Sequence, residues 1–143
     1  MAPQAGSARL CNNSAMVFRY AAATIIGAVL FVFYFQPFLP YAQRGQLSSH
    51  WWPFPVIELI CCFVLGLGRA SRRFAIPTCL LLTLFAANAF LIVADAATGD
   101  VDHNLFPIEF LFIVLLASPA YLGALFSAAV DRLRARGMID EVR

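Results

Sequence analysis

The chain has 143 residues, of which 62% are hydrophobic and 13% are charged, and its mean hydropathy is +0.78. Soluble domains carry about 25% charged residues. The composition therefore excludes a water-soluble globule, a disordered chain, a coiled coil, a small secreted disulfide scaffold and a nucleic-acid-binding module. It predicts an all-helical integral membrane protein that forms one domain over residues 1–143.

Four apolar segments follow one another along the chain, at residues 17–38, 53–68, 75–94 and 105–130. A membrane-spanning helix needs about 20 mostly apolar residues, and the first, third and fourth segments meet this length. The second segment is short even when Trp51 and Trp52 are added. It is either a span in a locally thin bilayer or a re-entrant or interfacial helix. We favour the span, because the distribution of arginines described below is one-sided only if this segment crosses the membrane.

The ends and interruptions of these segments carry further predictions. The first segment lacks a small-residue cleavage site and is interpreted as an uncleaved signal anchor, whose aromatic run at residues 31–35 should face lipid or a partner. Pro119 should kink the fourth segment, and Ser118 should bond the carbonyl that the proline leaves free. Residues 131–143 are expected to form a charged cytosolic tail that frays.

The arginines are distributed unevenly between the connecting segments. With four spans and a cytosolic N-terminus, nine of the ten arginines fall on the cytosolic side, and only Arg44 falls outside. Such a bias in short loops sets the orientation of membrane proteins. We therefore expect an antiparallel four-helix bundle with both termini in the cytosol. The expected location is the plasma membrane, as a multi-pass protein such as one of a bacterial inner membrane.

The second and fourth segments begin with a similar pattern, in which a histidine is followed by Phe-Pro and then by a glutamate. The pattern runs from His50 to Glu58 in one copy and from His103 to Glu109 in the other. Both copies enter the membrane from outside, so the pattern predicts two acids at similar depth near the outer surface. It is compatible with a parallel repeat of two helical hairpins.

Two interpretations of this pattern stay open. In the first, each glutamate lies in the first turn of its helix, where it complements the helix dipole and caps free N–H groups. In the second, the acids belong to a functional site, because acids inside spans are expensive and often mark one. The candidate catalytic acids are then Glu58 and Glu109, and the candidate metal ligands are His50, His103 and Asp95. The spacing does not specify a cofactor.

The stretch Pro107-Ile-Glu109-Phe110 resembles part of the Pro-x-Glu-Glu motif of membrane lycopene cyclases. Phe110 stands where that motif has its second glutamate, and the segment around Glu58 offers only Pro-x-x-Glu. In that family, acidic groups protonate a polyene and start its cyclisation. The resemblance implies such a role for Glu109.

Three cysteines lie within apolar segments, where no extracellular disulfide is expected. Cys61 and Cys62 share a helix face with Glu58, and Cys79 should lie at similar depth on the next helix. One interpretation is a soft-metal relay or redox pair, and a vicinal pair within a span resembles mercury-transport membrane proteins. The other is packing, which we favour because an apolar interior opposes thiolate formation.

Small and polar residues predict how the helices pack. Asn88 should hydrogen-bond across helices, and Gly27, Gly66, Gly68 and Gly123 should allow close packing.

The common catalytic and nucleotide-binding motifs are absent from the sequence. We therefore predict an accessory or structural membrane component without soluble catalytic chemistry. The alternative is a membrane-embedded enzyme, transporter or binding protein whose outer-face Glu/His site takes a metal, a proton or a lipophilic ligand. The expected partners are the lipid bilayer and either other membrane proteins or further copies of the chain, and nucleic acid is not expected.

Overall fold

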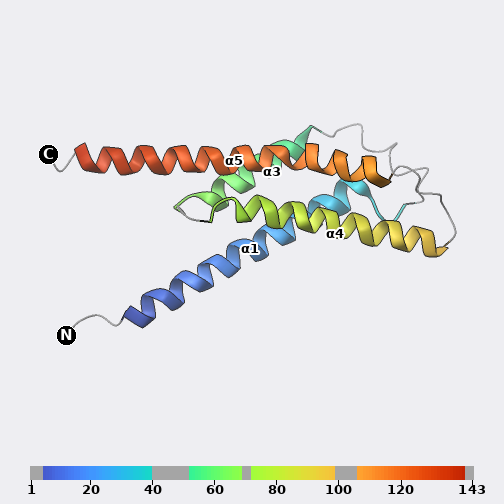
Figure 1. Ribbon diagram of the computed structural model, residues 1–143, viewed down its shortest axis with the longest axis horizontal. Coiled ribbons are helices and arrows are strands. Elements are labelled where there is room, and N and C mark those ends of the chain that lie inside the picture. The colour runs from blue at the N-terminus through green and yellow to red at the C-terminus, as the bar shows by residue number, and fades with distance from the viewer. Residues whose placement is uncertain (1–4, 40–51, 69–71, 99–105, 141–143) are drawn as a thin grey trace.

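The structure is a computed structural model that describes residues 5–39, 52–68, 72–98 and 106–140 (Figure 1). Over these ranges it is helical, as predicted, with α1 (Ala5–Phe35), α3 (Pro53–Gly66), α4 (Ala75–Thr98) and α5 (Phe106–Asp140). Three of these helices, α1, α4 and α5, contain stretches long and apolar enough to cross a membrane. With 14 residues, α3 is apolar but shorter than an ordinary span.

The helix ends differ from the predicted segments at two places. α1 stops at Phe35 rather than at residue 38, because Gln36 adopts a positive φ of 46° and Pro37 follows it. α5 continues as a helix to Asp140, through most of the segment predicted to form the charged tail. This stretch contains Arg132, Arg134 and Arg136 together with Leu133 and Ala135, and these residue types all have high helix propensity.

Pro119 lies inside α5, and the helix continues through it. Proline has no N–H group, so the carbonyl of Leu115, four residues earlier, loses its normal helical donor. The Ser118 hydroxyl donates to this carbonyl at 2.8 Å. The predicted role of Ser118 is therefore confirmed.

α1 and α3 lie against each other and run in opposite directions. Arg19 of α1 bonds to Leu65 and Leu67 at the end of α3. Near the other end of α1, the ring of Tyr34 packs edge-on against that of Phe54 at the start of α3, with centroids 5.0 Å apart. The 14 residues of α3 therefore extend along α1 from Tyr34 almost to Arg19.

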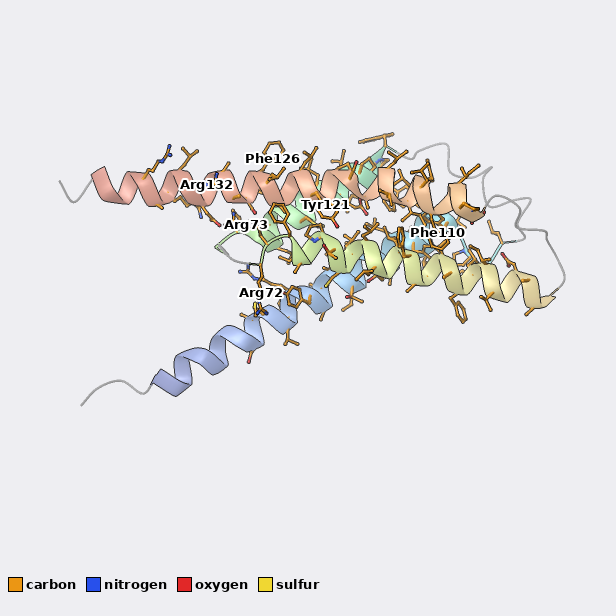
Figure 2. All side chains as sticks on the ribbon, viewed as in Figure 1. Arg72, Arg73, Phe110, Tyr121, Phe126 and Arg132 are labelled. Carbon is orange, nitrogen blue, oxygen red and sulfur yellow. The ribbon has the colours of Figure 1, made fainter. Side chains whose placement is uncertain are left out.

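α4 and α5 also run in opposite directions (Figures 1 and 2). Near the start of α4, the Thr78 hydroxyl lies 3.2 Å from that of Tyr121, in the middle of α5. Further along α4, Phe85 meets Phe110 near the start of α5, with ring centroids 5.1 Å apart.

Three glycines lie at close approaches between helices. A Cβ atom on Gly123 of α5 would collide with the carbonyl oxygen of Leu59 in α3, and one on Gly66 of α3 would lie 2.5 Å from the Ser127 hydroxyl. A Cβ on Gly27 would lie 3.3 Å from the Leu80 carbonyl oxygen, between α1 and α4. The packing role predicted for these three glycines is confirmed.

Gly68 has a different role. Its φ of 74° lies in the left-handed region, and no atom is within 4 Å of where its Cβ would be. Gly68 therefore permits the turn after α3 rather than a close helix approach.

The core is apolar, and so is much of the outer surface. Buried side chains include Leu30, Phe54, Leu80 and Ile113, while large apolar side chains remain exposed on all four helices. The aromatic run of α1 lies partly in the core and partly on the outer surface, since Phe31 is buried and Phe33 is 72% exposed. The prediction that this run faces outward holds for Phe33 and is wrong for Phe31.

Candidate functional site

Glu58 is the most unusual residue in the described interior. It belongs to a buried stripe of α3 with Phe54, Cys62 and Gly66, and it is 0% exposed. Neither carboxylate oxygen has a hydrogen-bond partner among the described residues. Because Glu58 follows the first turn and caps nothing there, the helix-start interpretation is wrong for this glutamate.

Glu109 has a different environment. It lies in the first turn of α5, where a carboxylate complements the helix dipole. The side-chain amide of Asn88, which is 3% exposed on α4, donates to Glu109 Oε2 at 3.5 Å. The helix-start interpretation therefore fits Glu109, and the predicted cross-helix hydrogen bond of Asn88 is confirmed.

The two glutamates do not lie side by side. The close approach of Leu59 to Gly123 places Glu58 next to the middle of α5. Glu109 lies 14 residues before Gly123 on α5, or roughly 21 Å along the helix axis. The repeated pattern predicted similar depths for Glu58 and Glu109, and the packing of α3 against α5 does not give them similar depths.

Asp95 lies near the end of α4 and is 9% exposed. It lines a mainly apolar cleft of about 390 Å³ with residues such as Phe31, Phe38 and Phe90. His50 and His103 lie outside the described residues. Among those that are described, no group of three or more His, Cys, Asp or Glu side chains could hold a metal ion.

Cys61, Cys62 and Cys79 are free thiols in the apolar part of the molecule. Cys62 is 0% exposed and belongs to the core, whereas Cys61 and Cys79 are partly buried at its edge. The burial of Cys62 beside apolar neighbours fits the packing interpretation.

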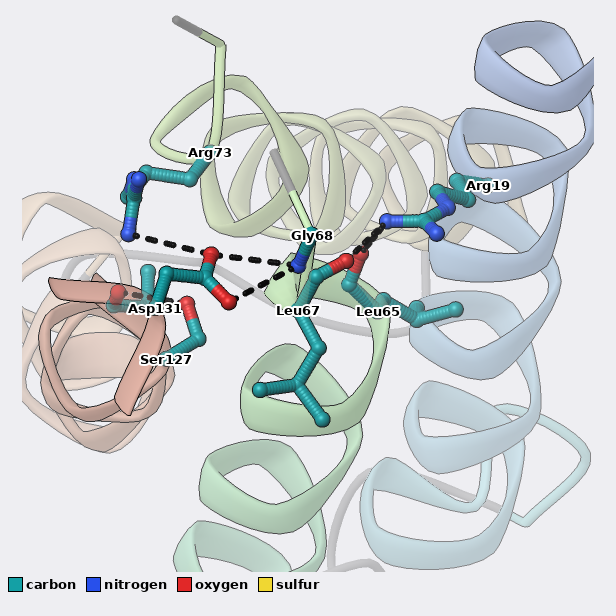
Figure 3. A network of polar contacts seen from close by, with 8 residues as sticks. Arg19, Leu65, Leu67, Gly68, Arg73, Ser127 and Asp131 are labelled. Carbon is teal, nitrogen blue, oxygen red and sulfur yellow. Dashed lines mark hydrogen bonds and ion pairs between the residues drawn. The ribbon is translucent and has the colours of Figure 1, made fainter. Parts of the chain in front are cut away.

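A network of polar contacts joins three helices at the end of the molecule where α3 stops (Figure 3). The Arg19 guanidinium donates to the carbonyl oxygens of Leu65 and Leu67, at 2.7 and 2.8 Å. The last carbonyls of a helix have no donors within that helix, and here a side chain of α1 supplies them. Arg19 therefore acts as a C-terminal cap for α3.

Asp131 completes this network from α5. Both of its carboxylate oxygens accept from the Gly68 N–H at 3.1 Å, and Arg73 lies 3.7 Å away as an ion-pair partner. This role of Asp131 was not predicted from the sequence, which placed the residue in a charged cytosolic tail. The sequence offered one signal for this contact. An acid, Asp131, directly follows the fourth apolar segment, and arginines directly precede the third.

We predict that Arg19→Ala lowers the free energy of unfolding by about 1.5 kcal/mol, since two charge-assisted hydrogen bonds to α3 are lost from a partly exposed position. Denaturant unfolding of the protein in mild detergent measures the change. Arg134→Ala is the control, because Arg134 is exposed on α5 and should alter stability by less than about 0.5 kcal/mol. Equal losses in both variants would contradict the capping role.

No protein-family model, curated protein or solved structure matches this chain. Two features of the geometry bear on function. One is the interior acid Glu58, and the other is the arginine-rich end at which side chains hold α1, α3 and α5 together.

Proposed function

We propose that the chain is a multi-pass protein of the plasma membrane whose four helices cross the bilayer with both termini in the cytosol. The observation that carries this proposal is the collection of arginines at one end of the helices. Arg19 lies against the end of α3, and Arg73 and Arg132 line one cavity beside the start of α4. Arginine is enriched on the cytosolic side of membrane proteins.

The position of α3 supports its inclusion as the fourth span. Its ends contact Tyr34 and Arg19 of α1, and those residues lie about 22 Å apart along the α1 axis. The helix therefore extends through most of the layer that the apolar part of α1 occupies. A local thinning of the bilayer or interfacial anchoring accommodates the remaining length.

Within the membrane, the role we propose is that of an accessory or structural component. Several polar side chains join helices, as Arg19, Asn88 and Asp131 do. Apolar side chains line a cleft of about 550 Å³ between α1 and α3, which offers a surface to another membrane-embedded helix.

Fusion reporters test the topology. We expect a C-terminal fluorescent protein to fold in the cytosol and periplasmic phosphatase reporters inserted at residues 40–51 and 99–105 to be active outside. If α3 does not cross, the reporter at 99–105 and the C-terminal reporter exchange sides, which would refute four spans. The reporter at residues 40–51 distinguishes an inverted protein from one with three spans, because it moves to the cytosol only in the inverted protein.

Site-specific photocrosslinking in native membranes tests the accessory role. A photoreactive residue at Phe33, which lines the α1–α3 cleft, should give a discrete protein adduct. Phe18 is the matched control, because it lies on the same helix and is 71% exposed, against 72% for Phe33. Lipid adducts alone at both positions would contradict a partner at this cleft.

A second candidate function is favoured by the environment of Glu58. A buried acceptor without a partner is satisfied by a proton of its own, or by a donor or cation that a ligand brings. On this alternative, Glu58 is the acid of a site for a metal, a proton or a lipophilic ligand. The polyene chemistry implied by the cyclase resemblance would instead use Glu109, which already accepts a hydrogen bond from Asn88.

Ligand-induced stabilisation separates the two candidates. Thermal unfolding is measured with a panel of divalent metals for wild type, Glu58→Gln and the control Glu109→Gln. Stabilisation that is lost only in Glu58→Gln would favour the second candidate. The same response in all three proteins would leave the accessory role as the better account.

A further inference from the structure

A cavity of about 570 Å³ lies beside the start of α4 and is closed on the other side by α5. Three of its lining residues are arginines: Arg72, Arg73 and Arg132. Figure 2 shows these three side chains at the same end of the helices. Its remaining described lining is apolar and includes Phe74 and Leu125.

The charge of the cavity is unbalanced. Arg72 and Arg132 are exposed, and no acid is among the described lining residues. The nearest counter-charge shown by the contacts is Asp131, which lies 3.7 Å from Arg73 and also accepts from the Gly68 N–H. Three guanidinium groups therefore have one neighbouring carboxylate. The excess positive charge attracts an anion to the site.

Arg73 supplies the second observation. The residue is 9% exposed, and its Nη1 atom lies 3.7 Å from Asp131 Oδ2, an ion-pair contact that is longer than a hydrogen bond, and makes no hydrogen bond to any described residue. A buried guanidinium N–H that has only this longer contact is incompletely satisfied. A phosphate oxygen in the cavity would provide an acceptor at hydrogen-bond distance, and guanidinium groups match phosphate geometry well.

The backbone N–H groups at the start of α4 contribute little to anion binding in this cavity. The N–H groups of Ala75 and Ile76 donate to the carbonyls of Arg72 and Arg73, at 3.1 and 3.4 Å. Binding of an anion here must therefore come from the arginine side chains rather than from free amides of the helix.

The apolar lining distinguishes a lipid from a free anion. Leu125 is 49% exposed at the cavity, and Leu122 and Phe126 continue an apolar surface along the same helix at 48% and 53% exposure. An inorganic anion gains no binding free energy from an apolar surface, whereas acyl chains pack on it. Basic pockets between spans at the cytosolic surface are known to bind anionic lipid headgroups.

We propose that the cavity between α4 and α5 binds an anionic phospholipid, with Arg72, Arg73 and Arg132 around its phosphate and its acyl chains along Leu125 and Leu122. The phosphate completes the hydrogen bonding of Arg73, and the exposed arginines adjust to it. The cavity meets a bilayer surface only if this end lies at the membrane interface, so the inference rests on the proposed topology.

Native mass spectrometry of the detergent-purified full chain tests the site with phosphatidylglycerol as the probe. We expect the double variant Arg72→Gln/Arg132→Gln to bind this lipid about tenfold more weakly than wild type does. Arg134→Gln/Arg136→Gln is the matched control, since it removes the same charge from exposed positions on α5 outside the cavity. The control should change the affinity by less than about twofold, because screened charges away from the site contribute little.

Several outcomes would overturn the proposal. Equal losses in both double variants would show diffuse attraction rather than a site. Equal binding of phosphatidylcholine with the same acyl chains would exclude headgroup charge as the determinant. Arginine-dependent stabilisation by inorganic phosphate alone, as strong as that by the lipid, would identify an anion site without lipid recognition.

The single variants Arg72→Gln and Arg132→Gln keep the test decisive if the double variant fails to fold. Each should weaken lipid binding by about threefold to fivefold. Lipid binding in detergent is independent of which way the protein faces in a membrane. A failed lipid test with correct reporter topology would therefore overturn this site alone, while reversed reporters would overturn the proposed orientation.

Discussion

Replacing Gly123 with valine is expected to lower the free energy of unfolding by about 3 kcal/mol or more. Any Cβ at this position collides with the Leu59 carbonyl oxygen and lies 3.0 Å from the Phe63 nitrogen. Both are backbone atoms of α3 that cannot rotate away, so the helices must separate and lose the packing around them. Denaturant unfolding in mild detergent measures the loss.

Gly137→Val provides the control for this experiment. Gly137 lies on the same helix, and no atom is within 4 Å of where its Cβ would be. Valine has a higher helix propensity than glycine, so this variant should be neutral or slightly more stable. Similar losses at both positions would show that the α3–α5 approach does not determine stability.

Replacing Glu58 with methionine is expected to raise the free energy of unfolding by about 2 kcal/mol. The wild-type carboxyl group is 0% exposed and has no hydrogen-bond partner in the described residues. An unsatisfied buried polar group costs about 1–3 kcal/mol, and methionine fills a similar volume without that cost. The same unfolding measurement detects the gain.

Glu109→Met is the comparison for Glu58→Met. This change removes the acceptor of Asn88 and a carboxylate from the first turn of α5, so it should destabilise the protein by about 1 kcal/mol. Destabilisation of Glu58→Met by the same amount would contradict the prediction. It would mean that a donor from outside the described residues reaches Glu58.

The sequence was sufficient to predict features that depend on local chemistry. Apolar segments of span length predicted α1, α4 and α5, and the lost N–H of Pro119 predicted the bond from Ser118 to Leu115. Small residues predicted the close approaches at Gly27, Gly66 and Gly123. Each of these predictions needed only the residue itself or its neighbours within about one helical turn.

Features that depend on helix rotation and register could not be predicted in the same way. Glu58 and Glu109 occupy similar places in a repeated pattern, yet one is buried against α5 and the other meets Asn88. The caps supplied by Arg19 and Asp131 join residues far apart in the chain. Such contacts follow only after the helices have packed, since a basic residue near a span has no partner specified by its own segment.

The cap that Arg19 provides has a consequence for membrane insertion. α3 has 14 residues, and a segment so short partitions weakly into a bilayer by itself. Its last carbonyls are bonded by a side chain of the helix that precedes it in synthesis. On the proposed four-span topology, we therefore expect α3 to enter the bilayer as the second half of a hairpin, after α1 is already in place. The order of the helices along the chain would then set the order in which they insert.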